Sequence, residues 1–185
     1  MSKVLDLIKS DLYRKTGNKS LEKFIVYFFR NPEFRFMFFL RLSAAYRFFN
    51  PIGMISRVWF KNLRIKYNIQ IQFMTQIGKG FCINHFGGII INEKTTIGDN
   101  CNICQGVTLG NISRGSLNGC PTIGDRVWIG ANSVIVGRIT IGNDVLIAPL
   151  SFVNFDIPNN AVVSGNPAKI INYNTSAGYS KNISE

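Results

Sequence analysis

Residues 123–153 read IGDRVWIGANSVIVGRITIGNDVLIAPLSFV, and an aliphatic residue returns at every sixth position. The same frame extends back to Ile71, with an insertion of two residues after Ile83 and a longer one after Leu109. The second position of the hexad is Gly at residues 78, 98, 110, 124, 130 and 142. A short fixed period is typical of a parallel β-helix, with the aliphatic side chain inward and glycine supplying backbone freedom at a corner. Helices repeat at about 3.6 residues and strands at about 2, so neither explains a period of six.

Charge and composition divide the chain into three parts. Residues 1–66 hold 14 Lys or Arg against 4 Asp or Glu, which accounts for +10 of the formal net charge of +11, and 10 of the 15 Phe lie there too. The remainder holds 7 against 6 and is nearly neutral. We therefore predict a basic, aromatic, α-helical segment over residues 1–66. A β-helix domain with a loop at residues 111–122 follows over residues 67–171, and residues 172–185 form a flexible tail.

The N-terminal segment is predicted to form short helices. Ser20 can cap a helix that runs to about Arg30 and ends before Pro32, because the residue before proline avoids helical dihedrals. Two interpretations of the aromatic and basic residues that follow stay open. They cap the open end of the β-helix or contact neighbouring subunits, or residues 20–66 lie on an anionic membrane. A spanning helix is excluded, because no run of ~18 apolar residues lacks Arg or Lys.

The cysteines indicate a reducing compartment. Cys82, Cys101, Cys104 and Cys120 show no disulfide spacing, and no cleavable signal peptide opens the chain. Cys101 and Cys104 fall at regular hexad positions, and no second ligand pair accompanies them, so we predict no metal site. The expected location is the cytoplasm, at the inner face of the membrane if the basic segment binds lipid.

The hexad pattern fails at two places, and we expect function there. The two-residue insertion in INHFGG, residues 83–88, contains His85, the only histidine of the chain. The longer excursion, NISRGSLNGCPT at residues 111–122, is long enough to cover a neighbouring surface.

Four motifs carry a resemblance to a known family. INHFGG, GVTLGN at residues 106–111, the repeats from residue 123 and SGNPAKI at residues 164–170 together resemble the hexapeptide-repeat acyltransferases. The most similar branch is that of serine O-acetyltransferase and its relatives that acetylate exopolysaccharides such as colanic acid. The resemblance covers residues 67–171. It implies a left-handed parallel β-helix, a homotrimer, and acetyl-CoA bound in a groove between adjacent subunits.

The resemblance also implies roles for particular residues. His85 matches the family's catalytic histidine, and an imidazole that titrates near neutral pH suits a general base acting on a hydroxyl. Lys169 is placed to meet the CoA phosphates as a point charge. Pro149 stands where relatives have a residue with an N–H, so one backbone contact is lost. The other cofactor-binding positions implied are Gly110, Asn111, Gly130, Ala131, Ala148 and Gly165.

The chain departs from serine acetyltransferases around the acceptor. They have Asp where this chain has Asn84, and Arg-His where it has Gly119-Cys120. Gln70 replaces an acidic residue that orients the imidazole, and Glu93 is the nearest acidic candidate in sequence for that task. We therefore assign acceptor binding to Asn84, Gln70, Cys120 and Glu93, and expect a neutral, hydroxyl-rich acceptor.

Three functional classes follow from these observations. The leading hypothesis is an acetyl-CoA-dependent O-acetyltransferase for a sugar or lipid-linked glycan in capsule, exopolysaccharide or O-antigen synthesis. Its alternative within the family is serine O-acetyltransferase. A non-catalytic trimeric scaffold that binds membrane is the alternative of another class. A zinc carbonic anhydrase is excluded because it needs three histidines. We expect no nucleic-acid binding, since the basic segment carries more Phe than base-reading polar side chains.

Overall fold

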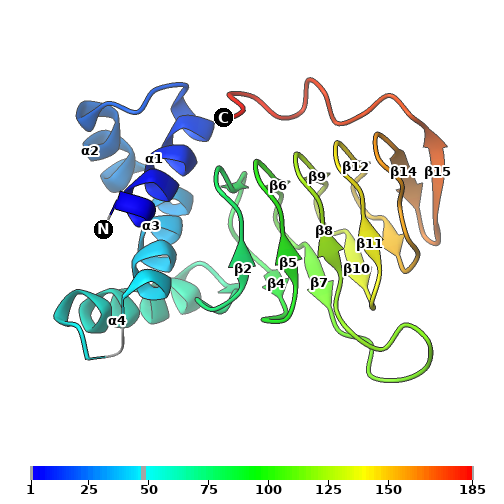
Figure 1. The fold of residues 1–185 in the computed structure, drawn as a ribbon, viewed down its shortest axis with the longest axis horizontal. Coiled ribbons are helices and arrows are strands. Elements are labelled where there is room, and N and C mark those ends of the chain that lie inside the picture. The colour runs from blue at the N-terminus through cyan, green and yellow to red at the C-terminus, as the bar shows by residue number, and fades with distance from the viewer. Residues whose placement is uncertain (1, 47–48, 185) are drawn as a thin grey trace.

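The structure is a computed structural model that describes residues 2–46 and 49–184, so residues 1, 47–48 and 185 of the predicted segments lie outside the described residues. Helices occupy the N-terminal part of the chain and β-coils the rest (Figure 1). The helices are α1 (Ser2–Thr16), α2 (Leu21–Arg30), α3 (Pro32–Ala45) and α4 (Pro51–Lys66). None of these described helices is long and apolar enough to cross a bilayer.

Three sheets, here called A, B and C, form the walls of the coil. Sheet A contains β1 (Ile69–Gln70), β4 (Ile89–Ile91), β7 (Thr108–Gly110), β10 (Val134–Val136) and β13 (Phe152–Val153). Sheet B contains β2 (Gln76–Ile77), β5 (Thr96–Ile97), β8 (Thr122–Ile123) and β11 (Thr140–Ile141). Sheet C contains β3 (Cys82–Ile83), β6 (Asn102–Ile103), β9 (Trp128–Ile129), β12 (Leu146–Ile147), β14 (Val162–Gly165) and β15 (Ala168–Asn172).

The register confirms the predicted parallel β-helix. Successive first positions of the hexads pair directly between coils, as Ile83 does with Ile103, Ile103 with Ile129 and Ile129 with Ile147. All four side chains are buried. Each aliphatic residue therefore lies above its counterpart in the next coil, and together they form a continuous core.

The glycines at the second hexad position have a different role from the one we predicted. None of them is among the glycines with positive φ; the left-handed corner residues include Asn100, Arg126 and Asp144 instead. What excludes a side chain is the neighbouring coil, since a Cβ added to Gly98 would lie 2.6 Å from the Gly124 carbonyl oxygen. These glycines are needed for close approach between coils rather than for a left-handed turn.

The helical segment closes the first coil. Ser20 caps α2, with its Oγ accepting from the Lys23 N–H at 3.3 Å, and α2 ends at Arg30 as predicted. Side chains of α3 and α4 join the core of the β-helix; the buried ones include Phe36, Met37, Leu40, Phe60 and Leu63. The inward faces of α3 and α4 therefore cap the open end of the β-helix, as the first of the two interpretations expects.

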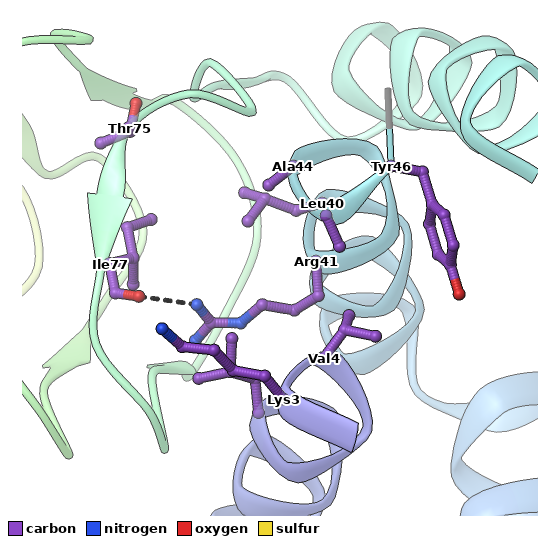
Figure 2. Close-up of a pocket in the computed structure, with 10 residues that line it drawn as sticks. Lys3, Val4, Leu40, Arg41, Ala44, Tyr46, Thr75 and Ile77 are labelled. Carbon is purple, nitrogen blue, oxygen red and sulfur yellow. Dashed lines mark hydrogen bonds between the residues drawn. The ribbon is translucent and has the colours of Figure 1, made fainter. Parts of the chain in front are cut away.

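A buried ion pair links α1 and α3 to sheet B. The Arg41 guanidinium contacts the Asp11 carboxylate through Nε and Nη2, at 2.9 and 3.1 Å. It also donates to the carbonyl oxygens of Ile77 (2.7 Å) and Gly78 (2.6 Å). Figure 2 shows the bond to Ile77 in a pocket that Arg41 and Ile77 both line. One side chain thus fixes two helices on the first coil.

Two strands and a returning segment form the C-terminal part of the chain. β14 and β15 form an antiparallel hairpin on sheet C. The following residues return along the coils to α1 (Figure 1). Ser176 donates to the Arg126 carbonyl oxygen at 2.6 Å, and Ser184 exchanges two hydrogen bonds with the Asn100 side chain. The tail therefore lies against the outer side of sheet C.

Candidate active site

His85 lies at the corner between sheets C and A, on the bulge between β3 and β4. Residues 83–91 span this corner, whereas residues 103–109 span the equivalent one with two residues fewer. Gly87 and Gly88 have φ of 111° and 67°, which glycine adopts without strain, so they accommodate the insertion. The His85 side chain is exposed. Within the described residues it has no hydrogen bond or ion pair, so neither ring nitrogen is engaged.

An aromatic contact attaches this bulge to the helical segment. The Phe86 ring lies on Tyr67, with centroids 4.9 Å apart, and Tyr67 is buried at the end of α4. The Tyr67 hydroxyl accepts a hydrogen bond from Arg35 Nη2 at 2.8 Å. Sequence reasoning missed both Arg35 and Tyr67, and no local pattern distinguishes them from the other basic and aromatic residues of the segment. They support the backbone next to His85.

The Asn84 amide is turned onto sheet C and already has partners. Its oxygen accepts from Asn102 Nδ2 at 3.2 Å and from the Cys82 thiol at 3.6 Å. Its nitrogen donates to Cys104 Sγ at 3.5 Å. Asn102 Oδ1 in turn accepts from the buried Arg14 guanidinium. In this arrangement both the oxygen and the nitrogen of the Asn84 amide are hydrogen-bonded within the protein. A contact of Asn84 with an acceptor stays a prediction.

Several predicted cofactor residues lie on the same edge of the β-helix as His85. Hydrogen bonds between successive coils run down this edge, from the Gly106 N–H to the Gly87 oxygen at 2.8 Å and from the Leu150 N–H to the Ala131 oxygen at 2.9 Å. Gly130 and Ala148 follow β9 and β12 at the same corner, and Gly165 and Lys169 lie in the β14–β15 hairpin at the end of sheet C. The structure thus aligns His85 with most of the predicted cofactor positions.

A second group of predicted residues lies at the corner between sheets A and B. Gly110 ends β7, and the Asn111 side-chain oxygen accepts a hydrogen bond from the Cys120 thiol at 3.6 Å. Partial burial raises the pKa of Cys120, an effect that nearby Lys94 opposes. Glu93 is exposed in the turn between β4 and β5, at this same corner. Sheet A separates this group from His85 within one chain, so Glu93 does not contact the imidazole there.

Gln70 occupies the first strand of sheet A. It pairs with Ile90 of β4, and both side chains are exposed. Gln70 is an amide and cannot replace a carboxylate as a charged partner of the imidazole. Among the described residues, no carboxylate forms a hydrogen bond or ion pair with His85 within one chain.

The long loop is anchored at its base. Ile112 and Gly119 exchange two backbone hydrogen bonds of 3.0 and 2.9 Å, and the Arg138 N–H donates to the Leu117 oxygen at 2.9 Å. The remainder projects beyond the coils (Figure 1). Gly119 has φ of 136°, and a Cβ added there would lie 3.0 Å from Arg138 Cβ. A larger residue at position 119 would strain this loop.

The pocket of Figure 2, between α1, α3 and β2, contains none of the predicted site residues. Among the described residues, no three His, Cys, Asp or Glu side chains come together in a way that would hold a metal ion.

Comparison with known sequences identifies relatives of the β-helix domain. Residues 120–154 match the family described as bacterial transferase hexapeptide (six repeats). Serine acetyltransferase 4 of Arabidopsis thaliana is 39% identical over 107 residues, covering 58% of this chain and 30% of the relative. Serine acetyltransferase of Helicobacter pylori is 37% identical over 117 residues, covering 63% and 68%. The putative colanic acid biosynthesis acetyltransferase WcaB of Escherichia coli K12 is 37% identical over 127 residues, covering 64% and 77%.

Solved structures extend the similarity to most of the chain. Serine acetyltransferase from Brucella abortus in complex with coenzyme A has a TM-score of 0.74 and 26% identity, covering 93% of this chain and 68% of that one. The Neisseria gonorrhoeae enzyme in complex with serine has the same TM-score and identity, covering 92% and 70%. The left-handed β-helix is thereby confirmed. The chain spans only about a third of the first plant relatives, at 30% and 32% of their length.

These matches favour serine acetyltransferases over the colanic acid branch that the motifs suggested. The first six curated relatives are serine acetyltransferases at 36–42% identity, and that of Helicobacter pylori is matched over 68% of its length. The chain therefore belongs to the bacterial hexapeptide transferase family and is serine acetyltransferase-like.

Proposed function

We propose that the chain is an acetyl-CoA-dependent O-acetyltransferase in which His85 is the general base. The observation that carries the proposal is the exposed, unengaged imidazole on a two-residue bulge, aligned with the predicted cofactor positions. The acceptor hydroxyl would attack the thioester carbonyl while His85 Nε2 or Nδ1 takes its proton. Collapse of the tetrahedral intermediate releases CoA as a thiolate, which the imidazolium can protonate.

The edge that carries His85 is suited to CoA. Backbone groups at Gly130, Ala131 and Ala148 lie along it, and the exposed Lys169 ammonium at its end supplies a charge for phosphate. Serine acetyltransferase at 26% identity has been solved in complex with coenzyme A. Pro149 offers no N–H, so a contact at that point would have to come from a neighbouring residue.

A homotrimer would unite the two groups of site residues. One edge carries His85 and Ala131, and the other carries Asn111 and Cys120, with sheet A between them. In a closed threefold assembly every interface is heterologous, so one edge of each subunit faces the other edge of the next. We infer that the complete site forms between subunits, with loop 111–122 reaching the neighbour's His85.

L-Serine is the acceptor that the comparisons favour. The first six curated relatives, at 36–42% identity, are serine acetyltransferases, and so is the structural match solved in complex with serine. Cysteine biosynthesis would then be the process served. Within this proposal, Asn84 and Cys120 would have to accommodate the ammonium and carboxylate of serine.

A sugar or lipid-linked glycan is the second candidate, favoured by the acceptor side of the site. Asn84 is a neutral amide held by Asn102 and Cys104, and Gly119 has a φ of 136°, at which an arginine would be strained. A putative colanic acid biosynthesis acetyltransferase is also 37% identical and is matched over 77% of its length. With a neutral amide at position 84 and no arginine at position 119, the site suits a neutral polyol better than a zwitterion.

One experiment tests the reaction and separates the acceptors. The protein is incubated with acetyl-CoA and, in parallel, L-serine, nucleotide sugars and lipid-linked glycans, and the products are weighed by mass spectrometry. His85→Ala should lower turnover by about 10²- to 10⁴-fold while CoA binding persists. Equal turnover by both proteins would refute the role of His85. Faster acetylation of L-serine than of any glycan would exclude the second candidate, and the reverse would exclude the first.

The scaffold alternative is tested in parallel. A ligand that binds only the folded state raises its thermal stability. Acetyl-CoA should therefore raise the melting temperature of the wild type and of His85→Ala alike. If it raises neither and no acceptor is acetylated, the protein is not an acetyltransferase.

A further inference from the structure

Helix α4 has one face that the capping role does not use. Gly53, Ser56, Phe60 and Leu63 are buried and pack inward on α3 and the first coil. The opposite side of the helix is exposed. Capping therefore explains only half of this helix.

The exposed side of α4 is apolar. Five large side chains on it are between 51% and 74% exposed: Met54, Ile55, Val58, Trp59 and Ile65. With 3.6 residues per turn they lie along one side of a 16-residue helix about 24 Å long. We call these five residues the outward face of α4. An apolar stripe of this length on a surface marks a contact with something apolar.

The charged residues of α4 are all basic. α4 contains Arg57, Lys61, Arg64 and Lys66 and no acidic residue. Lys61 and Lys66 are exposed, and no described carboxylate lies within ion-pair distance of either. An apolar face bordered by lysines, with a tryptophan among the apolar residues, is the composition of a helix that lies in a membrane interface.

We infer that the outward face of α4 docks on an anionic lipid surface. The apolar side chains enter the boundary between headgroups and acyl chains, and Lys61 and Lys66 contact the headgroups. Charge complementarity decides for lipid over a second copy of this chain. Two outward faces packed about a twofold axis would bring the same lysines together, and α4 has no acidic residue to neutralise them.

The experiment measures sedimentation of the full chain with vesicles of equal parts phosphatidylglycerol and phosphatidylcholine. Trp128→Phe serves as background, so that Trp59 is the only tryptophan and its fluorescence reports its environment. Binding with a blue shift is expected, and vesicles of phosphatidylcholine alone should bind far less. Lys61→Gln and Lys66→Gln should each weaken binding about fivefold. Val58→Asn/Ile65→Asn should abolish it, and both positions are exposed, so folding is preserved.

Controls separate this proposal from its rivals and from the proposed catalysis. Ile171→Asn removes an equally exposed apolar side chain at the far end of the β-helix and should leave vesicle binding unchanged. Absence of binding to anionic vesicles overturns the inference. So does a decrease in oligomeric state in Val58→Asn/Ile65→Asn without any effect on vesicle binding, because that result assigns the face to a second copy. The vesicle assay contains no acetyl-CoA and measures binding only. Its result therefore does not depend on whether the protein proves to be an acetyltransferase.

Discussion

The Arg41 guanidinium and the Asp11 carboxylate form a two-point ion pair in which both side chains are at least 96% buried. Asp11 Oδ1 also accepts from the Phe81 N–H at 3.0 Å, and Arg41 donates to the Ile77 and Gly78 carbonyl oxygens. The pair therefore connects α1, α3 and the first coil at one point. A buried charge that loses its partner is strongly destabilising, because its desolvation is no longer compensated.

Arg41→Met is expected to lower the free energy of unfolding by about 3–5 kcal/mol, since it leaves the Asp11 carboxylate buried without a cation. Urea titration followed by circular dichroism measures the change. Asp11→Asn/Arg41→Met removes both charges and should recover a large part of the loss. If the double variant is no more stable than Arg41→Met alone, uncompensated charge is not the cause.

Phe86→Ala is expected to lower the turnover of acetyl transfer about tenfold or more, because its contact with Tyr67 holds the bulge next to His85. Phe86 is 43% exposed, so the free energy of unfolding should change by only about 1 kcal/mol. Steady-state kinetics with acetyl-CoA and the identified acceptor provide the test. Tyr67→Phe keeps the ring contact and removes only the hydrogen bond to Arg35, so it separates the effect of that bond from the effect of the ring contact. Unchanged turnover in Phe86→Ala would show that the contact does not position His85.

Gly130→Ala tests the close approach of coils at the predicted cofactor edge. A Cβ there would lie 2.5 Å from Pro149 N and 2.7 Å from Pro149 Cδ, so the backbone after Ala148 must shift. We expect a stability loss of about 1–3 kcal/mol and a higher KM for acetyl-CoA. Gly124→Ala is the matched comparison, because its added Cβ would also meet the next coil, 2.9 Å from the Gly142 carbonyl oxygen, but at the corner between sheets B and C. Equal effects of the two substitutions on KM would remove Gly130 from the cofactor site.

The β-helix could be predicted from sequence because its information is local. Every coil repeats the same inward position, so the core positions from Ile83 to Ile147 follow from counting alone. The boundaries of α2 were equally local, since Ser20 and Pro32 mark them. His85 could be identified for the same reason, because it lies in the two-residue insertion that interrupts the repeat of six.

The tail and the Asn84 amide depend on partners distant in sequence. Arg14 of α1 donates to the Lys181 carbonyl oxygen and to Asn102, which in turn donates to Asn84. A polar tail without hydrophobic periodicity gives no local sign that a helix about 170 residues earlier will bind it. The division of the site between two edges likewise follows from which sheet each strand joins, which a single hexad does not reveal.

Arg14→Met is expected to release the tail. It removes hydrogen bonds to the Lys181 and Gly80 carbonyl oxygens and to the Asn102 side chain. Tryptic cleavage after Lys181 should then be at least about tenfold faster than in the wild type, because cleavage tracks the population of the open form. Mass spectrometry of the digest identifies the site. Lys9→Gln, an exposed substitution on the same helix, should leave the rate unchanged, and an equal rate in Arg14→Met would mean that other contacts hold the tail.

Cys101 should make the fold sensitive to alkaline pH. Burial raises the pKa of its thiol to about 12, from an ordinary value of about 9, and the thiol donates to the Gly124 carbonyl oxygen at 3.0 Å. Between these two pH values the unfolded chain loses the proton while the folded chain keeps it. The folded state then binds more protons, so stability falls as pH rises, by up to ~1.4 kcal/mol per pH unit for this thiol.

Cys101→Val should flatten that decline, because it removes the titrating group without disturbing the core. Val127 and Val145 occupy the equivalent buried position before β9 and β12, so the column already accepts this side chain. Urea titrations at pH 8 and about pH 10 would give the difference in the free energy of unfolding for each protein. Over this interval the free energy of unfolding should fall more for the wild type than for Cys101→Val. At pH 8 the two proteins should be about equally stable. A parallel decline in both would assign the alkaline sensitivity to other groups, of which buried Cys82 is the first to test.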